Sequence, residues 1–480
     1  MGSPLSHINL NDHKKIFTSL TVLALACLSF SGLLIIYAES SSSILISRCA
    51  FILLILSLAP GFKLREWVLT LFAALLIVGL WGKPNGREDL LFALDRAAFF
   101  AAFIYLVTLL KEAAQGSPSV LKLGVYLTRQ PPQQRYYSLA FGGHLLGILL
   151  NFGAVSLLTP LIQRGARGED GANHSPSRIL RLEQQQISAM IRGFSWMIMW
   201  SPTALTQAVL FTSFPGADLS VVIPLGIAAS VVMILVGRAE ERYEWRNTEE
   251  ESEMTQMAFP KRSAIRFMLV SGALIVSTFF VVVVADVSAA LALMLTAPVI
   301  MIIWVFEQGY QGDFSKALSL SYSNLSEIIV GSSGTSGRSA FTLGIAGFIG
   351  VAAAKLAPVE LLAEYMQTLD LPVWLFLISL PIIITLCGQI ALSPILIVVY
   401  LSSIFNQLPE LPADPTLIVF ALGAGWALSM SASPNASATL LISGVTGIAP
   451  TTLTWRWNGR YSILCFSVFC LAFYCLALWY

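Results

Sequence analysis

Charged residues are scarce in this chain: Asp, Glu, Lys and Arg together make up 11% of its 480 residues. Soluble proteins carry about 25% charged residues, and a soluble chain of this length needs polar side chains to cover its surface. Hydrophobic residues make up 56% of the chain, and the mean hydropathy is +0.76. The composition therefore excludes a soluble globular protein and indicates a chain whose side chains mostly face lipid.

Several kinds of chemistry lack the residues that they need. The net charge is +1, so we expect no nucleic-acid partner. The six cysteines lie in or beside apolar runs without metal-ligand spacing, which indicates packing roles. No cluster of His, Asp or Glu of the kind that an embedded enzyme needs occurs within a predicted span. We therefore expect no catalytic residues and no cofactor, and a membrane-embedded enzyme or assembly factor is the less favoured alternative.

The apolar runs predict an all-α polytopic membrane protein with about 11 transmembrane helices. The first run follows Lys14 and Lys15 and is longer than the apolar core of a signal peptide, so we interpret it as a retained span within an N-terminal segment, 1–47. The candidate spans lie near 16–36, 48–61, 67–82, 97–111, 194–214, 221–237, 267–285, 288–306, 339–355, 416–445 and 461–480.

Two further apolar stretches, 138–162 and 373–405, are interrupted by Gly, Pro and small polar residues. Within hydrocarbon, broken backbone is tolerated only where protein or a watery cavity surrounds it. We therefore predict a re-entrant helical hairpin in each stretch. The alternative is a pair of ordinary spanning helices joined by a loop.

The distribution of positive charge predicts the orientation in the membrane. With the N-terminus in the cytoplasm, a cytoplasmic linker at 238–264 and the C-terminus outside, most of the 28 lysines and arginines fall on the cytoplasmic side, and Arg192 is among them. This pattern is typical of a multi-pass protein of a bacterial inner membrane. The residues left on the outer side are Arg48, Lys83, Arg87, Arg96 and Lys355.

Three short patterns occur twice in the same order and at similar spacing, once in 48–237 and once in 265–480. Because the charge distribution starts the helix of Arg96 outside and that of Arg338 inside, we predict an inverted repeat. The paired patterns are DRAAF at 95–99 and GRSAF at 337–341, Asn151-Phe152-Gly153 and Gly388-Gln389, and SPTA at 201–204 and SPNA at 433–436.

Broken helices in an inverted repeat place a binding site near the middle of the membrane. A broken helix exposes free N–H groups that attract an anion and free C=O groups that hold a cation such as Na⁺. Interhelical packing is the alternative role for each residue alone, but Asn151 and Asn435 stand beside predicted breaks, where Na⁺ is also expected. The predicted binding residues are Asn151, Gly153, Ser201, Thr203, Gly388, Gln389, Ser433, Asn435 and Ser437.

Two of these stretches, LLNFGAVSLLTPLI at 149–162 and SMSASPNASATLLISG at 429–444, resemble segments of the ion transporter superfamily. This superfamily includes divalent-anion/sodium symporters, arsenite exporters and citrate carriers. The resemblance implies secondary active transport by an elevator-like movement, a homodimer, and Na⁺ or H⁺ as the coupling ion. The hairpin tips differ from the Ser-Asn-Thr of the divalent-anion symporters, since they read Asn151-Phe152-Gly153 and Gly388-Gln389-Ile390.

The predicted function is therefore secondary transport of a small anion, with an organic acid as the substrate class. Arg96 and Arg338, each at the start of a helix, are candidates for steering the anion, and snorkelling to lipid headgroups is the alternative. Export of a neutral or oxyanion solute such as arsenite is a rival function. A cation/proton antiporter is less favoured because neither hairpin nor either Ser-Pro break contains an acidic residue.

Overall fold

The computed structural model describes residues 10–37, 40–167, 175–246, 257–310 and 312–478, which form helices and connections without a strand. Within these residues, 10 helices are long and apolar enough to cross a membrane, which confirms the predicted all-α polytopic fold. They coincide with the predicted spans except at 194–214. That run is divided, because its first residues end a helix that begins at Pro176 and its last residues form a separate short helix. The predicted linker 238–264 lies partly outside the described residues.

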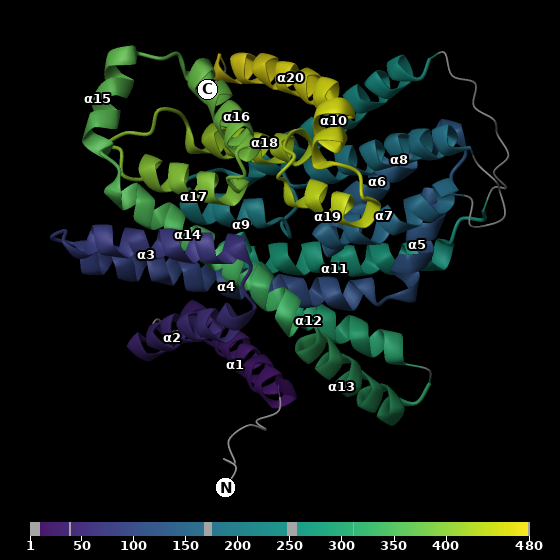
Figure 1. The fold of residues 1–480 in the computed structure, drawn as a ribbon, viewed down its shortest axis with the longest axis horizontal. Coiled ribbons are helices and arrows are strands. Elements are labelled where there is room, and N and C mark those ends of the chain that lie inside the picture. Colours follow the sequence, from purple (N-terminus) through teal and green to yellow (C-terminus); the bar gives the residue numbers. More distant parts are fainter. Residues whose placement is uncertain (1–9, 38–39, 168–174, 247–256, 311, 479–480) are drawn as a thin grey trace, which may run out of the picture. The chain divides into compact units, whose positions relative to one another are not determined.

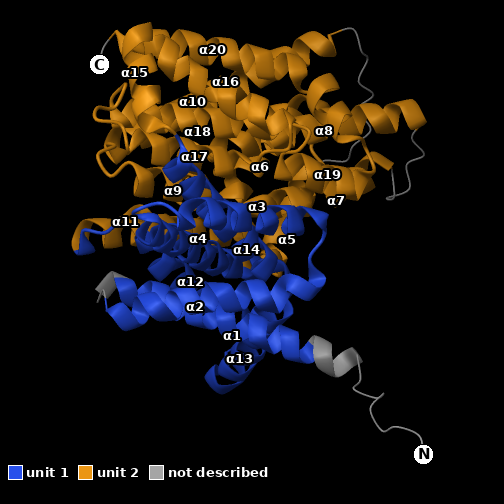
Figure 2. Cartoon of the chain, turned by 60° about the vertical axis from the view of Figure 1, so that its left-hand side comes forward, with its two compact units in different colours: residues 1–113, 285–287, 291–357 blue, residues 114–284, 288–290, 358–480 orange. Residues whose placement is uncertain are grey.

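The chain forms two compact units, and each unit takes segments from both predicted repeats. Unit 1 consists of residues 1–113, 285–287 and 291–357, and unit 2 of residues 114–284, 288–290 and 358–480 (Figure 2). The predicted boundaries at 237 and 265 separate two stretches of related sequence. Each compact unit instead combines residues from both stretches.

Unit 1 is built from long apolar helices. Its core contains small side chains at helix crossings, and the Gly344 backbone lies against Phe51 of α2 and Ala97 of α4. The elements of unit 1 are α1 (Leu10–Tyr37), α2 (Ser41–Leu58), η1 (Ala59–Gly61), α3 (Leu64–Trp81), α4 (Gly86–Gln115), α12 (Ala289–Gly309), α13 (Phe314–Gly331) and α14 (Ser333–Leu356).

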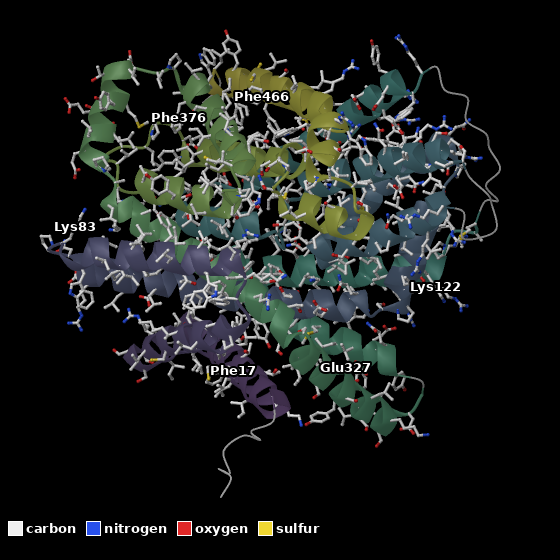
Figure 3. All side chains as sticks on the ribbon, viewed as in Figure 1. Phe17, Lys83, Lys122, Glu327, Phe376 and Phe466 are labelled. Atoms are coloured by element: carbon white, nitrogen blue, oxygen red, sulfur yellow. The ribbon has the colours of Figure 1, made fainter. Side chains whose placement is uncertain are left out.

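Helices α4 and α14 contain the paired Arg96 and Arg338 patterns and run in opposite directions. Arg338 lies near the start of α14 as expected, whereas α4 begins at Gly86, so Arg96 lies within its helix. Lys355, at the end of α14, pairs with Asp89 in the first turn of α4 at 3.0 Å. Lys83, which is labelled in Figure 3, lies in the preceding turn and donates to the Lys355 carbonyl. Arg338 instead donates to the carbonyl of Gly61, 2.8 Å away, at the far end of α2 and η1. These contacts support the inverted repeat, whose orientation in a membrane stays a prediction.

Unit 2 contains the interrupted helices. Each interrupted pair consists of two helices joined by a short connection. The colours of Figure 1, which follow the sequence, allow the two helices of each pair to be traced. The elements of unit 2 are α5 (Pro118–Thr128), α6 (Pro132–Leu150), α7 (Phe152–Arg167), α8 (Pro176–Met197), α9 (Leu205–Ser213), α10 (Leu219–Glu244), α11 (Lys261–Ala285), α15 (Val359–Leu369), α16 (Val373–Gln389), α17 (Pro394–Phe405), α18 (Pro415–Ala432), α19 (Ser437–Thr446), η2 (Thr452–Arg456) and α20 (Gly459–Ala477).

The same order of elements occurs twice along the chain. A long helix, a short helix, two interrupted pairs and another long helix follow one another as α4, α5, α6–α7, α8–α9 and α10. The second series is α14, α15, α16–α17, α18–α19 and α20, with η2 inserted before its last helix. The interrupted pairs therefore stand at corresponding places in both series.

The first predicted hairpin folds back on itself at Asn151. Gly142 of α6 lies against Leu127 of α5, and Leu161 of α7 lies against Gly124 of the same short helix. The two contacts are about equally far from Asn151 along the chain, so α6 and α7 return to the same neighbour. The stretch 138–162 is thus a helical hairpin in shape, and its re-entry into one side of a membrane stays a prediction.

The second predicted hairpin turns at residues 390–393. Phe376, near the start of α16, stacks edge to face with Phe405, the last residue of α17, at 5.6 Å between ring centres. Ala391 in the turn has a φ of 67°, a conformation that costs a non-glycine residue about 1–2 kcal/mol. Gly388 and Gln389 end the first arm and lie just before the turn itself.

Candidate functional site

The first hairpin is tied to the break between α8 and α9. Because Pro202 cannot donate a backbone hydrogen bond, the helix stops before it, and Ser201 and Thr203 turn their side chains inward. The Thr203 hydroxyl donates to the carbonyl of Ile148, in the last turn of α6, and lies 2.8 Å from the Ser201 hydroxyl. Both hydroxyl side chains are buried. A hydrogen bond therefore joins the end of α6, at the hairpin tip, directly to the break between α8 and α9.

Asn151 is the single residue between α6 and α7. Its φ of 49° and ψ of −128° lie outside the right-handed helical region, and its N–H still donates to the Gly147 carbonyl at 2.7 Å. Asparagine tolerates positive φ better than most residues do. The amide side chain is half-buried. Gly153 is buried in the first turn of α7.

The second hairpin is tied to the break between α18 and α19 in the same way. The Ser433 hydroxyl donates to the Gly388 carbonyl at 2.7 Å. The Asn435 amide donates to the carbonyls of Gly388 and Gln389 at 3.2 and 3.0 Å. A Cβ at Gly388 would lie 3.1 Å from the Ser433 side chain, so glycine permits this close approach. Thr203 and Asn435 hold matching positions in the two Ser-Pro patterns and make corresponding contacts.

Gln389 links the second tip to a third segment. Its amide nitrogen donates to the Ala432 carbonyl at 3.2 Å, at the end of α18. Its amide oxygen accepts from the indole N–H of Trp455 in η2 at 3.0 Å. The half-buried Gln389 side chain therefore joins α16, α18 and η2.

The second arms of the interrupted pairs pack on one another crosswise: α19 contacts α7, and α9 contacts α17. Each of these four helices begins at a break, where its first N–H groups lack helical partners. Ser437 is the exposed first residue of α19. Helix N-termini favour an anion, and the hydroxyl, amide and carbonyl oxygens nearby favour a small cation. All nine predicted binding residues thus lie in unit 2, on the two tips and the two breaks, and their role as one binding site stays a prediction.

Arg96 and Arg338 belong to unit 1. The Arg96 guanidinium stands over the ring of Phe92 at 5.3 Å, one turn earlier on the same helix. Arg338 is engaged with the Gly61 carbonyl. Anion steering by either residue stays a prediction.

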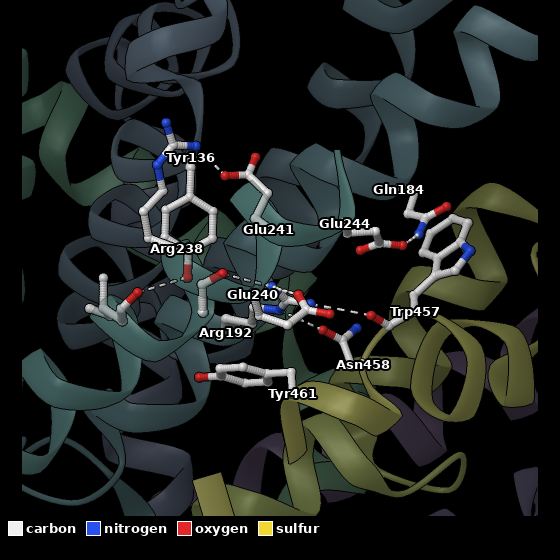
Figure 4. Close-up of polar contacts among 12 residues, drawn as sticks. Tyr136, Gln184, Arg192, Arg238, Glu240, Glu241, Glu244, Trp457, Asn458 and Tyr461 are labelled. Carbon is white, nitrogen blue, oxygen red and sulfur yellow. Dashed lines mark hydrogen bonds and ion pairs between the residues drawn. The ribbon is translucent and has the colours of Figure 1, made fainter. Parts of the chain in front are cut away.

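A buried ion pair in unit 2 was not predicted from the sequence. Arg192 of α8 is 2% exposed, although the charge distribution placed it in a cytoplasmic segment, and its Nη1 lies 2.8 Å from Glu240 of α10 (Figure 4). Nε donates to Asn458 at 2.9 Å, and Nη2 donates to the Trp457 carbonyl at 3.2 Å. The pair therefore binds α8, α10 and the start of α20 together.

His144 holds the first break from the side of α6. Its Nδ1 lies 3.0 Å from the Gly193 carbonyl, and its Nε2 lies 3.0 Å from the indole nitrogen of Trp200. The Trp200 N–H can only donate, so Nε2 accepts and Nδ1 carries the proton that goes to Gly193. Both ring nitrogens are used in this neutral form, which gives His144 a positioning role.

Two solved structures share this fold. The YdaH transporter of Alcanivorax borkumensis, described as having an unusual topology, is 13% identical with a TM-score of 0.52, over 87% of this chain and 98% of that one. MtrF of Neisseria gonorrhoeae, described as illuminating a class of antimetabolite efflux pumps, is 14% identical with a TM-score of 0.56, over 85% of this chain and 95% of that one. The sequence matches no protein-family model and no curated protein.

Proposed function

We propose that this chain is a secondary active transporter of a small organic anion, driven by Na⁺ or H⁺. The observation that carries the proposal is the pairing of each hairpin tip with a broken helix by hydroxyl and amide side chains, Thr203 on one side and Ser433 with Asn435 on the other. Four helix N-termini and free oxygen ligands are then available to an anion and its coupling ion. The fold shared with two transporters supports the same class of function.

In the proposed mechanism unit 2 carries the ligand. It contains both hairpins and both breaks, so movement of this unit as one body would open the site to each side of the membrane in turn. We further propose a homodimer in a bacterial inner membrane, with re-entrant hairpins, a cytoplasmic N-terminus and a periplasmic C-terminus.

Uptake into proteoliposomes tests the proposal. Radiolabelled succinate and citrate are offered with an imposed Na⁺ gradient, an imposed H⁺ gradient, or neither. We expect one gradient to accelerate uptake. Flux of both acids that is indifferent to both gradients would refute coupled transport of these anions.

Asparagine substitutions locate the site. Asn151→Ala and Asn435→Ala are expected to abolish flux while the protein remains inserted and folded. Asn406→Ala is the matched control, because the Asn406 amide also donates to a backbone carbonyl, that of Ser213 at 2.8 Å, but lies after α17 and away from the tips. Wild-type flux in Asn151→Ala or in Asn435→Ala would show that the substituted asparagine is not part of the binding site.

Export is the second candidate direction. MtrF is described as belonging with antimetabolite efflux pumps, which favours outward movement of the anion. Inside-out vesicles with the same two acids and gradients separate export from import.

A further inference from the structure

Unit 2 buries two carboxylates whose surroundings differ. Glu240 is 6% exposed and lies 2.8 Å from Arg192, which is itself buried. Glu183 of α8 is 4% exposed, and Nε of Arg167, whose side chain is half exposed, is 3.8 Å away. Neither Oε1 of Glu183 nor Oε2 of Glu240 accepts a hydrogen bond from the described residues, so the difference between them lies in the distance to the paired guanidinium. The charge of Glu240 is therefore compensated at contact distance, whereas that of Glu183 is not.

Glu183 lies in the interface between α7 and α8. Phe152, at the start of α7, contacts Phe194 near the end of α8, and Arg167, at the end of α7, reaches Glu183. The two helices therefore run antiparallel, and Glu183 faces the second arm of the first hairpin. A change of charge at Glu183 acts directly on this arm.

Two buried amides accompany the carboxylate. Gln163 of α7 is 8% exposed, and its amide lies beside Glu183, but its Nε2 makes no hydrogen bond of standard geometry to the described residues. Gln186, one turn after Glu183 on α8, is 0% exposed, and neither its amide nitrogen nor its oxygen has a described partner. Leaving such buried groups unpaired costs about 1–3 kcal/mol each. We call Gln163, Glu183 and Gln186 the α7–α8 polar cluster.

The other charges on the surrounding helices have different positions or partners. Glu244 of α10 accepts from Gln184 at 2.9 Å, and Arg135 of α6 donates to Gln185 at 3.3 Å. Lys122 of α5 is exposed, and α18 and α19, which pack on α8 and α7, contain no charged residue. On α10, which also packs on α8, Arg238 pairs with Glu241. Arg167 is the charged residue that the described part of the chain places within ion-pair distance of Glu183.

Protonation suits this environment. Burial raises the pKa of Glu183 above the usual range, while Arg167 and the nearby Gln163 amide lower it. A protonated carboxyl carries no charge and gains an O–H donor for a neighbouring amide oxygen. A deprotonated one attracts Arg167 and holds the end of α7 on α8. The two states therefore differ in how firmly the hairpin arm is held.

We propose that Glu183 is a proton-binding residue that makes H⁺ the coupling ion of this transporter. The proposal rests on the proposed transport function. The step is reversible transfer of one proton to and from the Glu183 carboxylate, with no other bond made or broken. It also modifies the expectation drawn from the hairpins and breaks, which contain no acidic residue, because the carboxylate lies on the helix beside them.

A substrate-independent experiment tests proton binding. Dicyclohexylcarbodiimide reacts with protonated carboxyl groups in apolar surroundings, and mass spectrometry locates the adduct. We expect an adduct on Glu183 that falls about tenfold for each pH unit above its pKa, and none on the ion-paired Glu240. Absence of an adduct on Glu183 at every pH, or an adduct independent of pH, would overturn the proposal.

Transport measurements test coupling separately. With succinate and citrate as probes, Glu183→Gln is expected to lose acceleration by the H⁺ gradient while keeping counterflow exchange, and Glu183→Asp to retain part of the acceleration. Glu364→Gln, at an exposed position on α15, is the control and should match wild type. Gradient-driven flux preserved in Glu183→Gln would refute coupling through Glu183. Absence of wild-type flux would instead count against the proposed transport function, and the labelling result would still decide proton binding.

Discussion

Breaking the buried ion pair in unit 2 should destabilise the protein strongly. In Arg192→Met the Glu240 carboxylate remains buried without its cation, and the Asn458 amide oxygen and the Trp457 carbonyl lose their donor. The guanidinium also leaves the ring of Tyr461, which it covers at 4.5 Å. Removal of one partner of a buried pair costs about 3–5 kcal/mol, so we expect Arg192→Met to lose that much free energy of unfolding.

The double variant gives the sharper test. In Arg192→Met combined with Glu240→Met no charge is left unpaired, and replacing a buried pair by apolar residues is often neutral. We therefore expect the double variant to be more stable than Arg192→Met alone. Equilibrium unfolding in mixed detergent and SDS micelles measures both differences, and a double-mutant cycle separates the pairwise term.

Lys316→Met is the surface control for this experiment. Lys316 lies 3.7 Å from Asp313, and both side chains are at least half exposed. Exposed pairs contribute about 0–1 kcal/mol, so little change is expected. A loss below about 1 kcal/mol in Arg192→Met, or a double variant less stable than the single one, would refute the assigned role of the pair.

Three further substitutions test the tips. Asn151→Gly should keep the fold, because glycine adopts positive φ freely, yet abolish flux in proteoliposomes; full flux would limit Asn151 to a backbone role. Ala391→Gly should raise the free energy of unfolding by at most about 1 kcal/mol, since the strain at φ 67° is relieved; a loss of stability would contradict this. Ser433→Ala removes the 2.7 Å bond to Gly388 and should cost about 1 kcal/mol and raise KM; an unchanged KM would contradict a role in holding the tip.

Hydropathy predicted most of the membrane helices because long apolar stretches depend only on local composition. It misread 194–214 because α8 begins earlier, at Pro176, in a polar segment. In that segment apolar residues recur at helical spacing, at Ile187, Met190, Ile191 and Phe194, and this pattern indicates an amphipathic helix. Because charged residues interrupt the segment, it contains no apolar run long enough to predict a span.

The tips and breaks were predictable because Asn, Gly and Ser-Pro within apolar runs are local signals. The partners of those residues were not, because a bond such as that from Asn435 to Gln389 joins segments far apart in the chain. Burial of Glu183 and Arg192 was hidden for the same reason: their polar faces are covered by α7, α6 and α10, and the order of residues does not reveal which helices cover them.

The division of the chain into interleaved units also has a consequence for synthesis. Unit 1 begins at the N-terminus but needs residues up to 357, and unit 2 begins at 114 but needs the C-terminal α18–α20. Domains usually fold in order as they leave the ribosome. Here the earliest helices must wait in the membrane, partly unpacked, until more than half of the remaining chain has been inserted, so a product truncated before residue 357 would contain neither unit complete.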